Sequence, residues 1–369
     1  MKFNLAKLGV SLSLSLLVGL NFLNAQSTVS TPTVGFVTIN MPAGSDTVIA
    51  PQLLRPSELN SSVSAVNVNG SQATLSLTGT TLTQNQFTYN ASTQTKVYYV
   101  LVVSGGLSGT YFTVVSNDTS SITINLDGLN PIGSDITAIE VRPTWTLASL
   151  FPVESSGVSF TPSSSSSPGA RRTQILVPNN TSSGVNRSAS ATYFFNNAAG
   201  VQDWVSTAAT STKAGDTAIL PGSYVIHRNT GGTPVGLSLT VAGGVFASQI
   251  SNYIATSASS PIDTYLALPR PTDYTLSDLG LDNTSFTQST STSPGGRRDT
   301  LLVVNVNGSG ANRAAAATYF RFNNNWYSTA ASTVITNSAV IPAGSAIIIR
   351  KVISDGNDRV WKNNLNVSL

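Results

Sequence analysis

Arg171–Phe195 reads RRTQILVPNNTSSGVNRSASATYFF, and Arg297–Arg321 repeats it as RRDTLLVVNVNGSGANRAAAATYFR. The two stretches align without a gap, and more than half of their positions are identical. Both contain short bursts of Val, Leu, Tyr and Phe bounded by Asn, Ser and Gly, which is typical of β-strands joined by turns. An internal duplication of a strand-rich segment therefore decides the fold of this chain.

The match continues on both sides and sets the extent of the duplicated unit. Three further pairs of segments correspond: Trp204 with Trp326, Pro221–Arg228 with Pro342–Arg350, and Arg142–Thr144 with Arg270–Thr272. We expect two β units of about 125 residues, 143–265 and 266–369. They can form two separate beads or pack about a pseudo-twofold axis, and the sequence leaves both arrangements open.

Composition indicates an all-β protein. Only 9% of the 369 residues are charged, and Glu and Lys, which favour helices, are scarce beside Ser, Thr, Asn and Gly. The absence of cysteine excludes disulfides, thiolate metal sites and a cysteine nucleophile. We expect an N-terminal antiparallel barrel or sandwich, the two duplicated β units, and few short helices.

The first 25 residues have the pattern of a cleaved export signal. Lys2 and Lys7 accompany the apolar stretch Leu8–Leu23, and Ala25 is a small residue suited to cleavage. The alternative is an uncleaved anchor, although the stretch is short for a membrane span. Cleavage removes two of 19 basic residues and leaves 17 against 16 acids. We expect a secreted or cell-envelope protein with no later transmembrane span and no nucleic-acid partner.

Residues 34–142 are expected to form the first domain. Turn dipeptides such as Asn69-Gly70 and Asp127-Gly128 accept positive φ and suit hairpins. They separate seven strand-like segments, which fit a small antiparallel barrel or sandwich: Val34–Ile39, Ser62–Val68, Ala73–Leu77, Lys96–Ser104, Tyr111–Ser116, Ser121–Leu126 and Ile136–Arg142.

One longer helix is expected between the two duplicated units, because five apolar residues have the spacing of one helix face. They are Val245, Phe246, Ile250, Tyr253 and Ile254. Thr146 and Thr275 are each placed to cap a single helical turn, and Asp278 stands where a capping box needs an acid.

Five short segments together resemble a family of uncharacterised secreted proteins found chiefly in verrucomicrobial bacteria. They are Gly35–Thr38, Pro42–Asp46, Arg142–Leu147, Ala191–Tyr193 and Leu268–Pro271. The resemblance covers nearly the whole mature chain. It implies an exported bacterial protein and brings no activity, cofactor or catalytic residue with it.

Arginine is the polar residue that recurs most clearly in the duplication. The pairs are Arg142/Arg270, Arg171/Arg297, Arg172/Arg298, Arg187/Arg313 and Arg228/Arg350. Guanidinium groups bind the carboxylates or sulfates of anionic glycans in bidentate geometry, and the binding candidates are Arg171, Arg172, Arg187, Arg297, Arg298 and Arg313. The structural alternative is that they bind loop carbonyls or stack on aromatic rings. The acids do not recur: Asp203 aligns with Asn325, and Asp299 with Thr173.

Trp204 and Trp326 are the second pair of binding candidates. With Tyr193, Tyr319 and Trp145 they can form a platform on which sugar rings stack, provided that the rings are exposed. Aromatic residues at period two in strands are more often part of the core, because they bury a large apolar area.

Catalytic and metal sites find little support in the sequence. The single histidine, His227, lies within a predicted strand, and Ile349 replaces it in the second unit. Too few His and Cys are present for a zinc site. The remaining candidates are oxygen-based: a carboxylate pair such as Glu140 and Glu154, or calcium at Asp355–Asp358 or Asp127.

These observations favour a non-enzymatic exported protein with a structural or adhesive role at the cell surface or in the extracellular matrix, without a cofactor. Self-association through sheet edges would suit that role. The alternative is a carbohydrate-binding protein with Trp and Arg clusters in each unit. An enzyme acting on polysaccharides is the third hypothesis, and it requires a deep cleft with two close acids.

Overall fold

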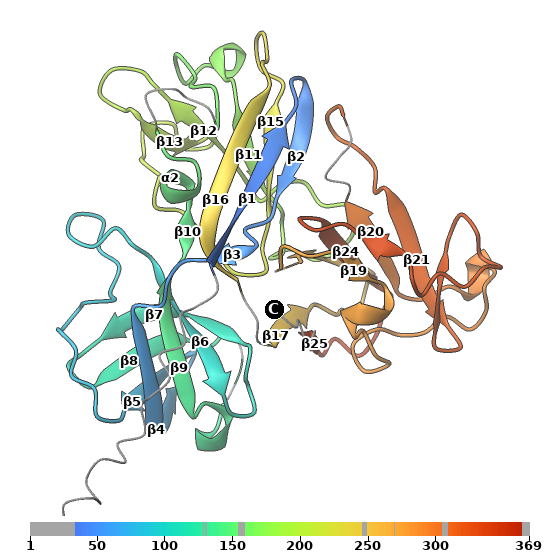
Figure 1. Ribbon diagram of the computed structural model, residues 1–369, viewed down its shortest axis with the longest axis horizontal. Coiled ribbons are helices and arrows are strands. Elements are labelled where there is room, and N and C mark those ends of the chain that lie inside the picture. The colour runs from blue at the N-terminus through green and yellow to red at the C-terminus, as the bar shows by residue number, and fades with distance from the viewer. Residues whose placement is uncertain are drawn as a thin grey trace, which may run out of the picture. The chain divides into compact units, whose positions relative to one another are not determined.

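The computed structural model describes residues 34–127, 129, 131–153, 159–245, 249–268, 270–304 and 309–363 (Figure 1). The expected export signal, 1–25, lies outside these ranges. The regular structure is almost entirely antiparallel β-strand, which confirms the all-β prediction. Within the described ranges, no helix has the length and apolar character needed to cross a membrane.

Residues 59–143 form a closed six-stranded barrel with the order β4-β5-β8-β7-β6-β9. Alternate side chains such as Leu75, Ile122 and Ile124 point into its core. Gly70 has φ +60°, as the hairpin between β4 and β5 requires. The elements are β4 (Leu59–Asn69), β5 (Gln72–Leu77), β6 (Tyr98–Ser104), β7 (Tyr111–Asn117), β8 (Ser121–Asn125), the 3-10 turn η2 (Gly133–Asp135) and β9 (Ala138–Pro143).

Two chain segments, 34–54 and 144–245, build what we call the first copy, and the barrel is inserted between them. Its main sheet has the order β13-β12-β11-β15-β2, and β1-β16-β3 and β10-β14 are smaller sheets. The elements are β1 (Val34–Met41), β2 (Ser45–Ile49), β3 (Leu53–Leu54), β10 (Trp145–Thr146), α2 (Leu147–Leu150), η3 (Pro168–Ala170), β11 (Gln174–Val177), β12 (Ala191–Asn196), β13 (Asp203–Ser206), β14 (Ala218–Ile219), β15 (Val225–Asn229) and β16 (Leu237–Val245).

Residues 249–363 form the second copy. Its main sheet has the order β22-β21-β20-β24-β18, with β17-β25 and β19-β23 as two-stranded sheets. The elements are β17 (Ile250–Ile254), β18 (Ile262–Ala267), β19 (Tyr274–Thr275), η4 (Ser277–Leu279), η5 (Pro294–Gly296), β20 (Thr300–Val304), β21 (Ala317–Phe322), β22 (Asn325–Ser328), β23 (Val340–Ile341), β24 (Ala346–Lys351) and β25 (Arg359–Asn363).

The main sheets of the two copies match strand for strand. In the first copy Asp46 of β2 lies opposite Arg228 of β15, and in the second Asp263 of β18 lies opposite Arg350 of β24. The strands β2 and β18 are therefore equivalent. The two-stranded ribbons β1–β16 and β17–β25 are equivalent by the same reasoning. In the first copy the strand before β2 pairs with the strand after β15, and in the second the strand before β18 pairs with the strand after β24.

Each copy has its own aromatic core between the main sheet and the ribbon. In the first copy the Trp204 ring lies 4.8 Å from the Phe160 ring, with Leu239 and Val241 of the ribbon in the same cluster. In the second, Trp326 lies 5.2 Å from Phe286. Burial of such large rings accounts for the conservation of both tryptophans within the duplication.

The strand pairing differs from the sequence-based division of the chain in two places. Residues 34–54 were grouped with the barrel, but β1, β2 and β3 pair with β15 and β16 of the first copy. Residues 250–265 were placed at the end of the first unit, but β17 and β18 pair with β25 and β24. The inserted barrel hides this arrangement, because it separates segments that are neighbours in the sheets.

The prediction of a helix between the two units is wrong. Val245 ends β16, and Ile250, Tyr253 and Ile254 belong to β17, so sheet pairing overrides the weak helical spacing. Phe246 lies outside the described residues. The expected caps are confirmed. Thr146 Oγ1 accepts from Ser149 N at the start of α2, and Thr275 and Asp278 exchange side chain-to-backbone hydrogen bonds as a capping box does.

Candidate functional site

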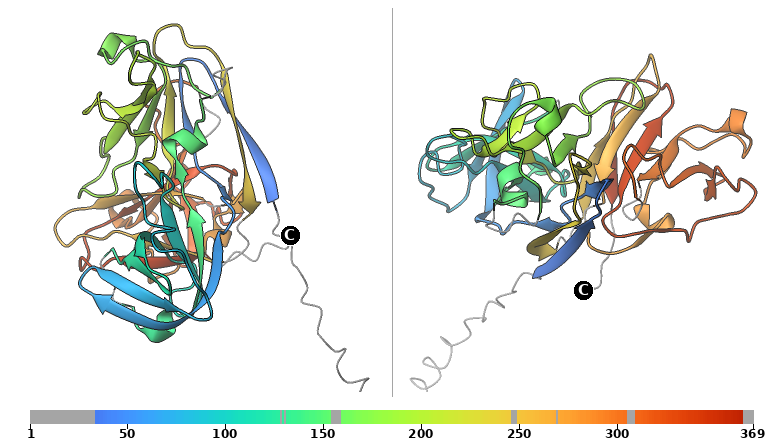
Figure 2. Two further views of the ribbon diagram at one scale, coloured as in Figure 1. Left: turned by 90° about the vertical axis from the view of Figure 1, so that its left-hand side faces the viewer. Right: turned by 90° about the horizontal axis from the view of Figure 1, so that it is seen from above.

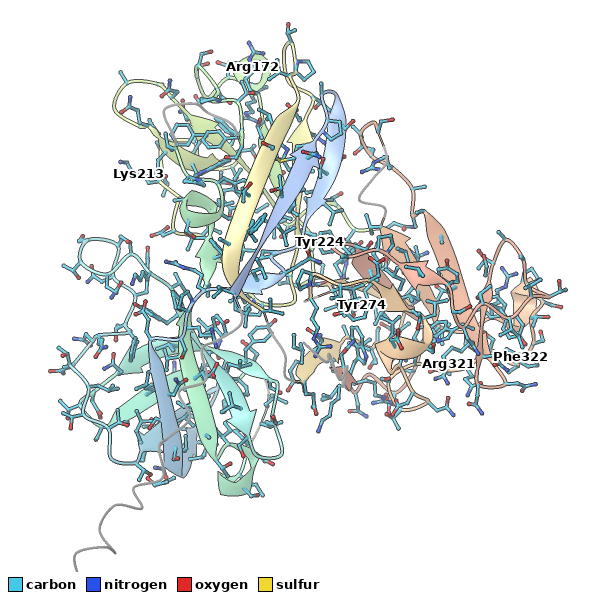
Figure 3. All side chains as sticks on the ribbon, in the orientation of Figure 1. Arg172, Lys213, Tyr224, Tyr274, Arg321 and Phe322 are labelled. Carbon is cyan, nitrogen blue, oxygen red and sulfur yellow. The ribbon has the colours of Figure 1, made fainter. Side chains whose placement is uncertain are left out.

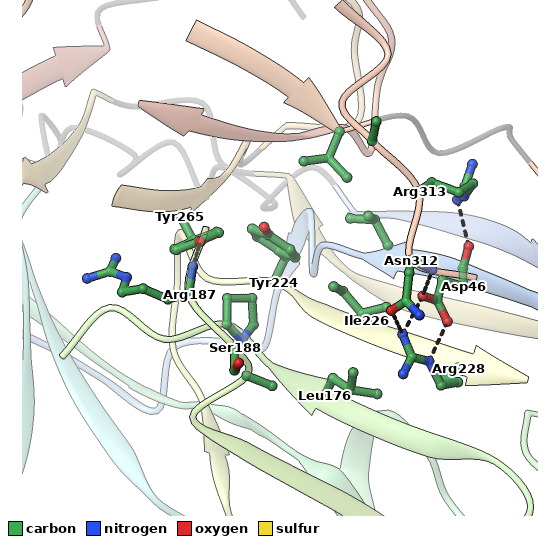
Figure 4. Close-up of a pocket in the computed structure, with 15 residues that line it drawn as sticks. Asp46, Leu176, Arg187, Ser188, Tyr224, Ile226, Arg228, Tyr265, Asn312 and Arg313 are labelled. Atoms are coloured by element: carbon green, nitrogen blue, oxygen red, sulfur yellow. Dashed lines mark hydrogen bonds and ion pairs between the residues drawn. The ribbon is translucent and has the colours of Figure 1, made fainter. Parts of the chain in front are cut away.

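The polar cluster around Asp46 joins the first copy to a loop of the second (Figure 4). Arg228 Nε and Nη2 donate to the two carboxylate oxygens of Asp46 at 2.8 and 2.7 Å. The backbone N–H of Asn312 also donates to Asp46, at 2.8 Å. Arg313 Nη2 donates to the backbone carbonyl of Asp46 at 2.6 Å. One acid thus holds an arginine of its own sheet and a loop from the other copy.

The same cluster occurs in the opposite direction around Asp263. Arg350 Nε and Nη2 donate to the Asp263 carboxylate at 2.7 and 3.0 Å, and the N–H of Asn186 donates to it at 2.8 Å. Arg187 Nη2 donates to the Asp263 backbone carbonyl. Each copy therefore contributes a loop that binds the edge strand of the other. The copies pack against one another with a reciprocal interface, not as separate beads.

The sequence Ser-Gly-x-Asn-Arg shapes the two loops, which we call the docking loops, 183–187 and 309–313. Gly184 and Gly310 have φ +98° and +92°, and Asn186 and Asn312 have φ +51° and +52°. Gly tolerates such values and Asn accepts them more readily than other residues. The bend turns the Asn N–H and the Arg side chain toward the same aspartate.

Both clusters combine a buried acid with permanent positive charge. Burial alone would raise the pKa of Asp46, but hydrogen bonds from Arg228 and from the Asn312 N–H outweigh it and lower that pKa. The hydrogen bonds to Asp46 and Asp263 in turn raise the pKa values of Arg228 and Arg350. Asp46 and Arg228 therefore stay a charged pair near neutral pH, and Arg350 likewise keeps its charge beside Asp263.

The remaining recurring arginines also have partners within the chain. Arg171 lies over the Phe194 ring at 5.0 Å and donates to Ser166 O, and Arg297 lies over Phe320 at 4.8 Å. The backbone N–H groups of Arg172 and Arg298 donate to Ser163 and Ser289 Oγ at 3.0 and 3.1 Å. Figure 3 shows Arg172 at the end of the first copy remote from Tyr224. The structure does not bring the six candidate arginines together at one site.

Trp204 and Trp326 do not form the exposed platform that sugar stacking requires. Their relative exposures are 1% and 3%, and both rings lie in the aromatic cores. This corrects the expectation of a tryptophan surface. The rings fill the space between the main sheet and the ribbon, where their large area stabilises each copy.

His227 is fully buried and lies beside Phe151, at a ring-centroid distance of 6.0 Å. Its Nε2 is 3.0 Å from the backbone carbonyl of Ser159. Burial lowers the pKa of His227 to about 4, so the ring is neutral near pH 7. Among the described residues, no acid or hydroxyl group forms a hydrogen bond with its ring.

The acidic candidates are engaged or dispersed. Glu140 pairs with Arg142 at 2.7 Å, and Glu154 lies outside the described residues. Asp355 pairs with Arg359 at 2.8 Å, and Asp358 accepts from Thr256 N. The described part of the chain holds no group of three His, Cys, Asp or Glu residues suited to a metal ion.

Two adjoining cavities, of about 240 and 360 Å³, lie beside the docking loops and share Pro178, Tyr224 and Tyr265. We call them together the tyrosine cleft. Tyr265 lies under Arg187 at 5.3 Å, and its hydroxyl accepts from the Arg187 N–H. Tyr224, which lines both cavities, is 3% exposed. Tyr111 of the barrel lines the larger cavity, and burial raises its pKa to about 12.

No protein-family model, curated protein or solved structure matches this chain. Its function must therefore be argued from its own geometry.

Sequence reasoning missed Asp46 and Asp263 because both precede the segments that were aligned. A signal was present: Asp46–Ala50 reads DTVIA and Asp263–Ala267 reads DTYLA. The statement that acids do not recur is thus wrong for this pair. The sequence also offers no indication of Tyr224 and Tyr265, because neither recurs in the duplication. Ala346 of the second copy aligns with Tyr224, and Val48 of the first copy aligns with Tyr265.

Proposed function

We propose that this protein is an exported, non-enzymatic structural or adhesive component of the cell surface or extracellular matrix. Its resemblance to secreted verrucomicrobial proteins supports the export alone. One observation carries the proposal. Two of the arginines that recur in the duplication, Arg313 and Arg187, donate to Asp46 and Asp263 of the opposite copy and hold the two copies together. Duplication of a motif that fixes shape is expected when a rigid architecture is the selected property.

The composition supports the same role. A chain with 9% charged residues and no cysteine presents a polar, weakly charged surface and depends on sheet hydrogen bonding and core burial for stability. Such a surface suits a component that stays outside the cell and meets other polymers there.

The proposal is tested by the location of the natural protein. We expect the mature chain, beginning at or near Gln26, in the envelope or matrix fraction, from which high salt should release little of it because its charge is low. Mass spectrometry of that fraction and of the cytoplasm is the measurement. A chain that keeps residues 1–25 and stays in the cytoplasm would contradict it.

Carbohydrate binding is the second candidate, and the tyrosine cleft favours it. Hydroxyl and guanidinium groups form hydrogen bonds with sugars, and Tyr224, Tyr265 and Arg187 line the smaller cavity, whose volume of about 240 Å³ is large enough for a small saccharide. The site contains neither of the tryptophans expected from the sequence, but Arg187 and Arg313, two of the six candidate arginines, line it.

A panel of neutral and sulfated polysaccharides tests this candidate. Tyr265→Val places in the second copy the residue that the first copy has at the equivalent position, Val48, and should abolish binding in the cleft. Tyr327→Val, a change of the same kind in β22 outside the cleft, is the matched control. Absence of binding to every polysaccharide, or equal loss in both variants, rejects the candidate.

A further inference from the structure

The ribbon β1–β16 carries the most exposed large hydrophobic side chains of the described chain. Val34 is 74% exposed and Phe36 77%, and both lie on β1. Figure 2 shows β1, the blue strand that follows the grey trace, beside β16. β1 pairs with β16 on one side and is the edge strand of its sheet. Among the described residues, none forms a backbone hydrogen bond to its other side.

The second copy shows how the equivalent edge is covered. Met41 pairs with Leu237, which lies eight residues after the end of β15. Ile254 pairs with Arg359, which lies eight residues after the end of β24, so the two pairs are equivalent. Counting back from Met41 and Ile254 makes Thr38 equivalent to Ser251. Ser251 is buried, whereas Thr38 is exposed.

The barrel covers Ser251. The Ser251 N–H donates to the carbonyl of Gly109 at 3.0 Å, and its hydroxyl donates to the carbonyl of Ser108 at 3.0 Å. The barrel loop is thus already bonded to the edge of β17. It cannot also cover β1, so within the described ranges the first copy has the same edge without this cover.

β1 lacks the features that normally prevent an edge strand from pairing. Its sequence, VGFVTINM, contains no charged residue and no proline, and the described residues show no irregularity in its register with β16. Natural edge strands are usually protected by Lys, Pro or a bulge. An unprotected edge with an apolar tip is a surface that pairs with another strand.

We infer that β1 pairs antiparallel with β1 of a second copy of this chain, which gives a twofold-symmetric dimer with Phe36 at or next to the axis. The identical strand is the best occupant because each edge offers the other the same free N–H and C=O groups, and no charges repel. Phe36 would face Phe36 of the other chain, a favourable aromatic cross-strand pair.

The size of the contact limits its strength and its symmetry limits its extent. With Phe36 at the axis, Val34–Thr38 of one β1 face the same residues of the other, and this short contact buries less area than a standard stable interface, so the dimer should form in a concentration-dependent manner. Pairing through the same strand on both chains closes the assembly at two and does not propagate to a fibre. This inference rests on the proposed structural role, for which it names the partner.

Engineered cysteines test the pairing, because the natural chain has none. Mature protein with Phe36→Cys should form a disulfide-linked dimer under mild oxidation, since facing residues of paired strands lie within disulfide reach. Val34→Cys and Thr38→Cys detect a shifted register. Ala242→Cys is the matched control: Ala242 lies beside Phe36 on the same exposed face but on β16, one strand further from the axis.

We expect at least a tenfold faster cross-linking for one of the three β1 positions than for Ala242→Cys. Equal rates at all four positions overturn the inference. Sedimentation velocity gives a second measurement: Phe36→Lys should abolish the dimer and Ala242→Lys should retain it, with unchanged circular dichroism. Loss in both variants would indicate contact through the ribbon face and would also overturn it.

The outcome is distinguishable from that of the proposed function. A monomer that fractionates with the envelope refutes strand pairing alone, and a dimer found in the cytoplasm refutes the structural role alone.

Discussion

Lys351 donates to the carboxylate of Asp299 in the interior of the second copy, where their side chains are 2% and 0% exposed. The first copy has Asn229 and Thr173 at the equivalent positions and contains no charge there. Thr173 Oγ1 accepts from the Thr161 N–H, as Asp299 accepts from the Thr287 N–H. Asn229 Nδ2 donates to the backbone carbonyls of Pro42 and Val235. The first copy therefore has two neutral side chains where the second has an ion pair.

This difference predicts a double-mutant cycle. Asp299→Thr or Lys351→Asn alone should lower the free energy of unfolding by about 3–5 kcal/mol, because each leaves a buried charge without its partner. The double variant, which places both residues of the first copy in the second, should cost much less than the sum. Urea unfolding measures all four proteins, and additive costs would contradict the account.

The reciprocal interface predicts a large effect of Asp46→Asn. The change removes the charge that binds Arg228 and the docking-loop N–H of Asn312, and we expect a loss of about 2–3 kcal/mol. Asp355→Asn is the matched control, because it breaks an exposed ion pair with Arg359 and should leave stability almost unchanged. Thermal unfolding compares them, and equal shifts in Tm would refute the importance of the interface.

The burial of His227 leads us to predict that the protein loses stability in mild acid. Its pKa is lowered from 6.5 to about 4 by burial, so between these values only the unfolded chain takes up the proton. Stability is fully present above pH 6.5 and falls as the pH is lowered toward 4, by about 3 kcal/mol for this shift.

His227→Ile, which copies Ile349 of the second copy, should remove most of that pH dependence. Denaturant midpoints at pH 7 and pH 4.5 provide the measurement. A variant as acid-sensitive as the natural protein would show that other groups are responsible.

The sequence predicts much of the fold because the periodic features are local. Alternation in segments such as Gln72–Leu77 gives the inward face of the barrel, and the repeated Arg-Arg and Asn-Arg motifs give the duplication. The capping pair Thr275 and Asp278 is equally local, since it depends on three residues of spacing.

The candidate site was only partly predictable, because it depends on contacts between distant segments. Asp46 contacts Arg228 and Arg313, which lie 182 and 267 residues later in the sequence, with the barrel between them. The recurring motifs identified the docking loops but not their partners. The tryptophans were ambiguous for the same reason: period two in a strand gives the face of a side chain, but not which face another sheet covers.

The barrel contacts the second copy at Gly109. We therefore predict that alanine destabilises the protein more at this position than at a glycine that faces open space. Gly109 has φ +86°, and a Cβ there would lie 2.5 Å from the backbone carbonyl of Gln249. Gly70 has φ +60° with open space around it, so Gly70→Ala measures backbone strain alone, about 1–2 kcal/mol. Gly109→Ala should cost more, because the barrel loop must also withdraw from β17.

The specific readout is hydrogen exchange at the Ser251 amide, which donates to Gly109 O: its protection should fall in Gly109→Ala and persist in Gly70→Ala. Unchanged protection in both variants would show that the barrel is held to the second copy by other contacts.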